Sequence, residues 1–217
     1  MTRSIFKMPR IVFIRHAESV WNVSGQVQGS LSHPCITLSE KGVASVQPML
    51  AALPKPQVLI TSPLIRCKQT AEAWFGVPFD RIQIPTKVEP AMAEIKAGTY
   101  EGLYIKDLKD DPLWRVWMKH PATFPGFPEG EDLHAFSHRI LRGAGEICAA
   151  YPHPNQTVCV FTHGVVMRVL KCFLANQDIS QLWAHKVDNL EQIPLSEEQI
   201  LKFQHFHQPK EVDIGLR

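Results

Sequence analysis

Two histidines each follow a short apolar run and are suited to share one chemical site. Arg15 and His16 come directly after the apolar residues 11–14, and His163 follows the apolar residues 158–161 and a threonine. A neutral imidazole can act as a nucleophile, and a guanidinium binds oxyanions as a charged planar fork. Functional groups collect beyond the carboxyl ends of strands in an open parallel sheet. We therefore expect both histidines to meet at one sheet edge.

The elements that must position these residues alternate between strand-like and helix-like segments. Short apolar runs, and one alternating run at the end, predict strands at 11–14, 57–60, 81–84, 158–161 and 200–206. Apolar spacing and capping residues predict helices at 39–53, 64–75, 131–151 and 165–174. This order predicts a single three-layer α/β domain over 1–217, with a mostly parallel sheet covered on both faces.

Two of the helix starts carry cap signals. Ser39 is a suitable N-cap for the helix that runs toward Leu53, although Pro48 weakens that helix. Ser62 and Pro63 predict a cap followed by a proline in the first turn. Arg66 is then expected near the start of that second helix, close to the sheet edge.

Composition excludes several classes of function. The chain has 217 residues, 45% apolar content and a formal net charge of +2, with no basic cluster of the kind that binds nucleic acid. No apolar stretch approaches the roughly 20 residues needed to span a membrane, and residues 2–10 carry charges without a secretory core. The partner is therefore expected to be a small molecule, and a cytoplasmic location is predicted.

Neither cysteines nor histidines form a metal-binding pattern. Five cysteines without CxxC spacing favour reduced thiols over a disulfide framework or a zinc site. His134 and His138 share a helical face at i, i+4, but the sequence offers no third ligand. No metal site is predicted.

Four separated segments together resemble one known family. They are Arg-His-Ala-Glu-Ser at 15–19 with Trp21 and Asn22, the segment 62–71 around Arg66, the segment 94–103 that begins at Glu94, and Thr-His-Gly at 162–164. In this order they resemble the histidine phosphatase superfamily, also called the phosphoglycerate mutase-like family, over most of 10–175. The resemblance implies a phosphomonoester hydrolase with no cofactor.

The resemblance also implies roles for the site residues. His16 is the implied nucleophile, which forms a phosphohistidine and splits one displacement into two easier steps. Arg15 and Arg66 are implied to meet the charge of the transferring phosphoryl group. His163 is the implied second pocket histidine, protonated and bonded to phosphate. The further implied phosphate donors are Asn22 and the backbone N–H of Gly164.

Glu94 occupies the place of the family's general acid. It would give a proton to the leaving alkoxide, so it must be protonated at working pH, which burial or a dianionic substrate favours. We expect hydrolysis to fall at high pH as this acid ionises. Arginines and a histidine supply the positive charge, so no metal is required.

Taken alone, each residue has a structural interpretation as well. Arg66 could be a solvated helix residue, Glu94 a surface carboxylate, His163 a satisfied core histidine and Asn22 a turn residue. Three other residues that match the family are predicted to serve helix starts or packing: Glu18, Ser19 and Glu101.

Two alternatives to hydrolysis stay open. A cofactor-dependent mutase would pass the phosphoryl group from His16 to a sugar-acid hydroxyl, although the mutases' longer insertion and their motif around the acid are absent. A catalytically silent module would bind phosphate esters without turnover and without labelling a histidine. The fate of the phosphoenzyme separates the three.

Parts of the chain depart from the family pattern. Cys35-Ile36-Thr37 replaces an aspartate and proline found in many relatives, while 128–132 resembles a Pro-Gly-Gly-Glu-Ser element of the smaller phosphatases. Residues 104–130 are expected to form a lid or insertion, and 176–217 a tail that closes the pocket or makes a subunit contact, in a monomer or homodimer. Four aromatic residues could line the pocket or belong to the core: Trp114, Trp117, Phe124 and Phe127.

Overall fold

The computed structural model describes residues 10–153 and 156–207. The predictions for the charged segment 2–9 and for 208–217 of the tail lie outside the described residues.

A five-stranded sheet forms the centre of the molecule. Its strands are β1 (Arg10–Arg15), β2 (Val58–Thr61), β3 (Thr86–Val88), β4 (Thr157–Thr162) and β5 (Gln192–Pro194). They lie in the order β3-β2-β4-β1-β5, and all neighbouring pairs are parallel except β1 with β5. The mostly parallel sheet predicted from the sequence is confirmed.

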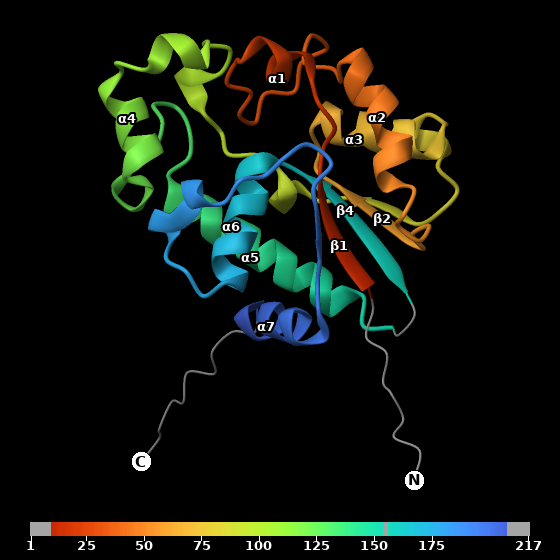
Figure 1. The fold of residues 1–217 in the computed structure, drawn as a ribbon. Helices are drawn as coiled ribbons and strands as arrows, with labels where there is room; N and C mark the ends of the chain where they lie inside the picture. The colour runs from red at the N-terminus through yellow and green to blue at the C-terminus, as the bar shows by residue number, and fades with distance from the viewer. Residues whose placement is uncertain (1–9, 154–155, 208–217) are drawn as a thin grey trace, which may run out of the picture.

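Helices cover both faces of the sheet and give three layers (Figure 1). On one face lie α2 (Glu40–Leu50) and α3 (Ile65–Phe75); on the other lie α5 (Leu133–Ala150), α6 (Gly164–Leu174) and α7 (Glu197–His207). Alternate β1 residues serve the two cores: Val12 packs with the α2–α3 side and Phe13 with the α5–α7 side. Because both faces are buried, the strands read as continuous apolar runs.

Short helical elements lie in the connections between the main helices and strands. The α-helices there are α1 (Val20–Ser24) and α4 (Pro112–Lys119). The 3-10 helices are η1 (Phe79–Arg81), η2 (Pro90–Met92), η3 (Gly98–Tyr100), η4 (Ile105–Leu108), η5 (Pro121–Thr123) and η6 (Ile179–Ala184).

Three local predictions are wrong. The run 81–84 forms no strand: η1 ends at Arg81, and β3 begins at Thr86, where every strand residue is exposed and no apolar pattern marks it. The segment 200–206 is helix α7 rather than an edge strand, because Ile200 and Phe203, three residues apart, are both fully buried.

The third error concerns the start of α3. Its N-cap is Leu64, with no side-chain cap bond, so Ser62 is not the cap, although the helix begins at Ile65, one residue from the predicted start at 64. Ser62 Oγ instead lies 2.7 Å from a ring nitrogen of His163. By contrast, Ser39 does cap α2, as predicted, by accepting from the Gly42 backbone N–H.

Candidate active site

The two histidines meet at the carboxyl ends of neighbouring strands. In the β1–β4 register Arg15 pairs with Thr162, and the His16 N–H donates to the Thr162 carbonyl at 2.9 Å. The next residues on the two strands, His16 and His163, therefore lie side by side, with ring centroids 5.3 Å apart. Both side chains are buried. The sequence-based expectation that they converge is confirmed.

His16 is held as a neutral imidazole. Its Nδ1 lies 2.7 Å from the Ala17 carbonyl, a contact that only an N–H can satisfy, so Nε2 keeps its lone pair. Burial lowers the pKa of His16 well below its usual 6.5, and the charges of Arg66 and Arg15 lower it further. A neutral ring with a free Nε2 is the form that can attack phosphorus.

His163 packs behind His16 against α3. Its Nε2 lies 2.7 Å from Ser62 Oγ and 3.5 Å from Cys67 Sγ. Burial, followed by the charge of Arg66, lowers the pKa of His163 well below 6.5. The protein groups alone therefore favour a neutral ring. The protonated form implied by the family resemblance needs the negative charge of a phosphate ester.

Two arginines flank the histidines and share an unusual feature. Arg15 donates from Nη1 to the Val187 carbonyl at 2.8 Å, and Arg66 donates to the carbonyls of Gly29 at 2.7 Å and Leu31 at 3.1 Å. Within the described part of the chain, the buried Nε atoms of both arginines have no acceptor. Burial lowers the pKa of Arg15 to about 10, so it remains charged near neutral pH.

Glu94 lies between the arginines and the start of α6. Its Oε1 accepts from the Ile95 N–H and its Oε2 from the Val165 N–H, each at 3.0 Å. The carboxyl is only 9% exposed and lines the same cavity as His16. These two backbone bonds fix the carboxyl group beside the phosphate-binding residues.

Asn22 presents its amide nitrogen to the cavity. It is the third residue of α1, and its Oδ1 accepts from the Ser19 N–H at 3.0 Å in a capping box. The Ser19 hydroxyl is also 2.9 Å from Gln28 Oε1, and Gln28 is a second cavity amide that sequence analysis missed.

The residues assigned to helix starts or packing have those roles. Ser19 is the N-cap of α1, Glu18 accepts from the Ser39 hydroxyl at 2.8 Å, and Glu101 accepts from the Ala97 N–H at 3.0 Å. None of these contacts requires a substrate.

Gly164 begins α6 next to the arginines, as predicted. A Cβ at this position would lie 3.3 Å from Arg15 Nε and 3.3 Å from Arg168 Nη1, so glycine allows both guanidinium groups to approach. Arg168, one turn along α6, was missed because nothing in its local sequence distinguishes it from a surface arginine.

The C-terminal part of the chain completes the site. The Val187 carbonyl binds Arg15, and Asn189 Nδ2 donates to the His16 carbonyl at 2.9 Å. Leu190 has a φ of 60°, and the chain then pairs with β1 as β5. No motif marked these residues, because each of these contacts uses the backbone of at least one partner.

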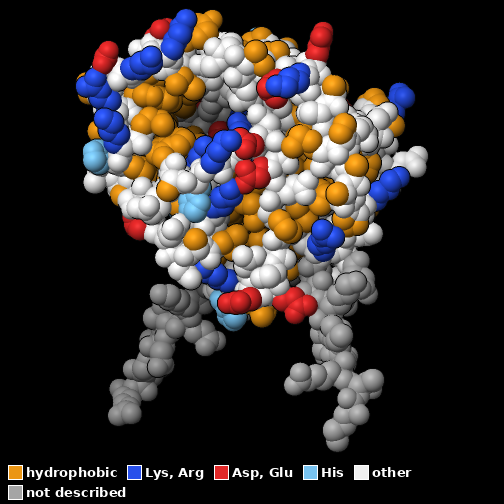
Figure 2. Space-filling model, viewed as in Figure 1, with side chains coloured by type: hydrophobic (Ala, Val, Ile, Leu, Met, Phe, Trp, Pro, Cys, Tyr) orange, Lys and Arg blue, Asp and Glu red, His pale blue; other side chains and the backbone are white. Residues whose placement is uncertain are grey.

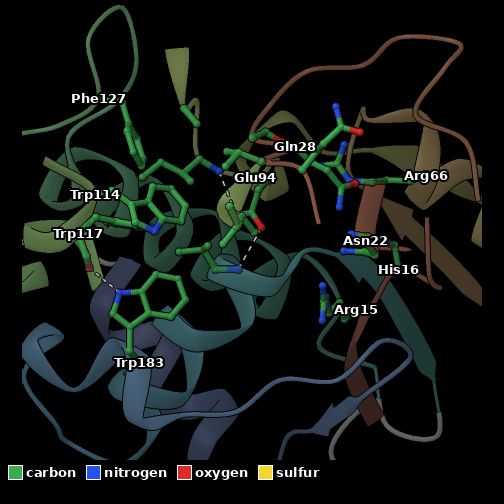
Figure 3. Close-up of a pocket in the computed structure, with 17 residues that line it drawn as sticks. Arg15, His16, Asn22, Gln28, Arg66, Glu94, Trp114, Trp117, Phe127 and Trp183 are labelled. Carbon is green, nitrogen blue, oxygen red and sulfur yellow. Dashed lines mark hydrogen bonds between the residues drawn. The ribbon is translucent and has the colours of Figure 1, made fainter. Parts of the chain in front are cut away.

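Six of the polar residues described above line one cavity of about 170 Å³: Arg15, His16, Asn22, Gln28, Arg66 and Glu94. His163 and Gly164 are buried behind this lining. Figure 2 shows the hollow on this face, with hydrophobic side chains gathered along one side. In Figure 3 Arg15, His16, Asn22 and Arg66 lie on one side of Glu94 and four aromatic rings on the other. The rings are Trp114, Trp117, Phe127 and Trp183. Of the four aromatic residues singled out in the sequence, Phe124 alone does not line the cavity, and it packs behind Trp117 and Phe127.

The described residues contain neither a metal-binding cluster nor a membrane-spanning helix. Residues 10–153 and 156–207 hold no group of three or more His, Cys, Asp or Glu placed to bind a metal ion. In the same ranges every helix is too short or too polar to cross a bilayer. All five cysteines are free thiols, as expected.

Comparison with known proteins identifies the family. The model of the histidine phosphatase superfamily (branch 1) matches residues 11–198. The chain belongs to the histidine phosphatase superfamily. Phosphoserine phosphatase 1 of Hydrogenobacter thermophilus is 31% identical over 187 residues, which cover 84% of this chain and 83% of that protein. A metal-independent phosphoserine phosphatase of Arabidopsis thaliana is 27% identical over 169 residues, which cover 76% of this chain and 68% of that protein.

Solved structures agree in fold. A mycobacterial glucosyl-3-phosphoglycerate phosphatase in complex with VO3 superposes with a TM-score of 0.72 at 24% identity, over 86% of this chain and 92% of that one. Together, the family match and the phosphatase relatives make this histidine phosphatase a phosphoric monoester hydrolase that acts on small phosphorylated metabolites.

Proposed function

We propose that His16 is the nucleophile of this phosphatase and that Arg15, Arg66 and His163 hold the phosphate it attacks. One observation carries the proposal. Three buried guanidinium Nε–H donors, those of Arg15, Arg66 and Arg168, have no acceptor in the described part of the chain, and the first two arginines line one cavity with the buried neutral imidazole of His16. Buried donors are almost always bonded. A tetrahedral oxyanion at this point supplies the acceptors and neutralises the positive charge.

The first step is a displacement at phosphorus. The lone pair of His16 Nε2 forms an N–P bond while the P–O bond to the leaving alcohol breaks. Glu94 acts as the general acid and gives its proton to the leaving oxygen. The arginines and the amide of Asn22 meet the charge on the equatorial oxygens.

The second step returns the enzyme to its starting state. Water attacks the phosphohistidine, the O–P bond forms and the N–P bond to His16 breaks. The Glu94 carboxylate accepts the proton that the water loses and becomes the acid of the next cycle. The products are an alcohol and inorganic phosphate.

We infer hydrolysis rather than mutase transfer or silent binding. The relative at 31% identity bears a phosphatase name. The two residues that turnover of an ester requires, His16 and Glu94, both line the cavity. Phosphoserine is the substrate that two relatives' names suggest. The enzyme is inferred to act in the cytoplasm on small esters, as a monomer or homodimer.

Charge at the site comes from protein groups, so we propose that no metal takes part. The rate should be the same before and after dialysis against EDTA. A loss restored by one added divalent ion would contradict this inference.

Replacement of the nucleophile tests the mechanism. His16→Ala is expected to lose turnover of a phosphomonoester panel by several orders of magnitude, as for removal of a covalent nucleophile. His205→Ala, at an exposed position on α7, is the matched control. Wild-type enzyme quenched in alkali should carry label from ³²P-ester on residue 16. Retention of more than about a tenth of the rate in His16→Ala would refute the role.

The label also separates the alternatives. Hydrolysis requires that the phosphoenzyme decay to inorganic phosphate at the same rate with or without an added sugar acid. Transfer of label to that acceptor would establish a mutase. Binding of esters with neither label nor turnover would establish a silent module.

A further inference from the structure

The half of the cavity beyond Glu94 is lined mainly by aromatic side chains. Its walls are the four rings of Trp114, Trp117, Phe127 and Trp183, here called the aromatic box. The rings face the space on the opposite side of Glu94 from the phosphate-binding residues (Figure 3). The leaving oxygen of a phosphate ester receives its proton from Glu94, so the leaving group must lie in the aromatic box.

The box is held rigidly before any substrate arrives. Trp117 contacts Phe127 with ring centroids 5.2 Å apart and meets Trp183 edge-on at 5.1 Å and 84°. Trp114 lies 6.3 Å from Phe127. The Trp183 Nε1–H donates to the Trp117 carbonyl at 2.6 Å, which fixes a ring from η6 against helix α4. Little ordering of side chains is then needed when a ligand binds.

The charges around the box disfavour a zwitterionic leaving group. Arg168 lies over the Trp183 ring, with its guanidinium carbon 4.9 Å from the centroid, so this ring already faces a cation. A substrate ammonium beside it would meet like charge. Arg168 does not line the cavity. Among the described residues that do, Glu94 is the acidic one. A carboxylate on the leaving group would find no cation among the residues that line the box.

Size sets a second limit. The phosphate side and the aromatic side share one cavity of about 170 Å³. Apolar cavities of about this size bind a single benzene ring, so the box suits a small leaving group. Aliphatic residues complete the apolar surface, among them Ile95, Ile105 and Val165. A nucleoside or a second ring would extend out of the cavity.

We propose that the aromatic box selects phosphomonoesters whose alcohol is compact, neutral and aromatic, in preference to phosphoserine. This inference rests on the proposed function, since the box binds the group that leaves when His16 attacks. Offset and edge-to-face ring contacts favour such an alcohol beyond its apolar burial. Trp183 is then a specificity-determining residue supplied by the C-terminal segment.

The test compares esters of primary alcohols, so that the intrinsic reactivity of the leaving groups is similar. Benzyl phosphate, propyl phosphate, O-phosphoserine and phosphocholine are assayed with the wild-type enzyme. We expect kcat/KM for benzyl phosphate to exceed that for O-phosphoserine by about 2- to 12-fold, the equivalent of one ring contact. This comparison uses the native chain and does not depend on the folding of a variant.

Variants then locate the preference. Trp183→Leu and Phe127→Leu remove one ring each and keep an apolar side chain, and each should lower the ratio of kcat/KM for benzyl over propyl phosphate by about 2- to 12-fold. Trp74→Leu is the matched control, because Trp74 packs on Phe161 in the core of the opposite face. Its ratio should equal that of the wild type.

The outcomes separate the two proposals. One contrary result is turnover of O-phosphoserine or phosphocholine through phospho-His16 with a kcat/KM at least equal to that for benzyl phosphate. That result would overturn the selectivity of the box and leave the mechanism standing. An unchanged ratio of kcat/KM for benzyl over propyl phosphate in both folded variants would also overturn the selectivity of the box and leave the mechanism standing. Absence of turnover and of labelled histidine with every ester would overturn the mechanism as well.

Discussion

Arg66→Lys tests whether one guanidinium serves both the fold and the phosphate. Arg66 donates from Nη1 to the Leu31 carbonyl and from Nη2 to the Gly29 carbonyl. Its Nε has no acceptor among the described residues and is free to bind a ligand. A lysine ammonium keeps the charge but is a single point and cannot reach both carbonyls and a phosphate in this geometry.

The magnitude follows from the bonds that are lost. A hydrogen bond from a charged donor contributes about 1.5–3 kcal/mol to stability. The loss of one carbonyl contact should lower Tm by about 3–12 °C, at about 2–4 °C per kcal/mol for a chain of this size. The loss of one phosphate contact of equal strength should lower kcat/KM by about 10- to 150-fold.

Thermal melts and steady-state kinetics on one preferred ester measure both effects. Arg142→Lys is the control, because Arg142 is exposed and its bond to Glu146 is an i,i+4 helix pair worth about 0.3–0.5 kcal/mol. If Arg66→Lys melted within about 1 °C of the wild type and kept at least half of its kcat/KM, the dual role of this guanidinium would be refuted.

Two further predictions follow from the lowered pKa of His16 and His163. Because His16 stays neutral well below pH 6.5, kcat/KM should hold its plateau through pH 6; an acidic limb centred at 6.5 or above would contradict this. The unfolding free energy, measured with urea, should fall as pH drops below about 6.5, because the unfolded chain then binds protons that the buried rings exclude. Equal values at pH 7.5 and 5.5 would show that neither histidine is held neutral.

Much of the fold was predictable because its strongest elements carry local patterns. The predicted helix 131–151 appears as α5 with Asp132 as its N-cap, since its apolar spacing and its cap agree. The buried runs of β1 and β4 were equally clear. Failures came where burial depends on distant partners: α7 packs Phe203 on Phe173 and Phe13, and no local pattern separates that arrangement from a strand.

The site was predictable to a similar extent and for a related reason. His16, His163, Arg66 and Glu94 lie in motifs, so their convergence could be expected from sequence. Asn189 could not be found in this way, because its amide acts on the backbone carbonyl of His16, and a backbone partner leaves no trace in residue type. Trp183 was missed for want of any motif in the tail.

The late position of residues 187–190 in the chain has a consequence for biosynthesis. A ribosome-bound chain can complete the β1–β4 pairing, and so bring the two histidines together, once β4 has emerged. Until Asn189 has also cleared the exit tunnel, the His16 carbonyl lacks its amide donor and Arg15 lacks its Val187 acceptor. Catalytic competence should therefore be among the last properties that a newly synthesised molecule acquires, after most of its sheet is already in place.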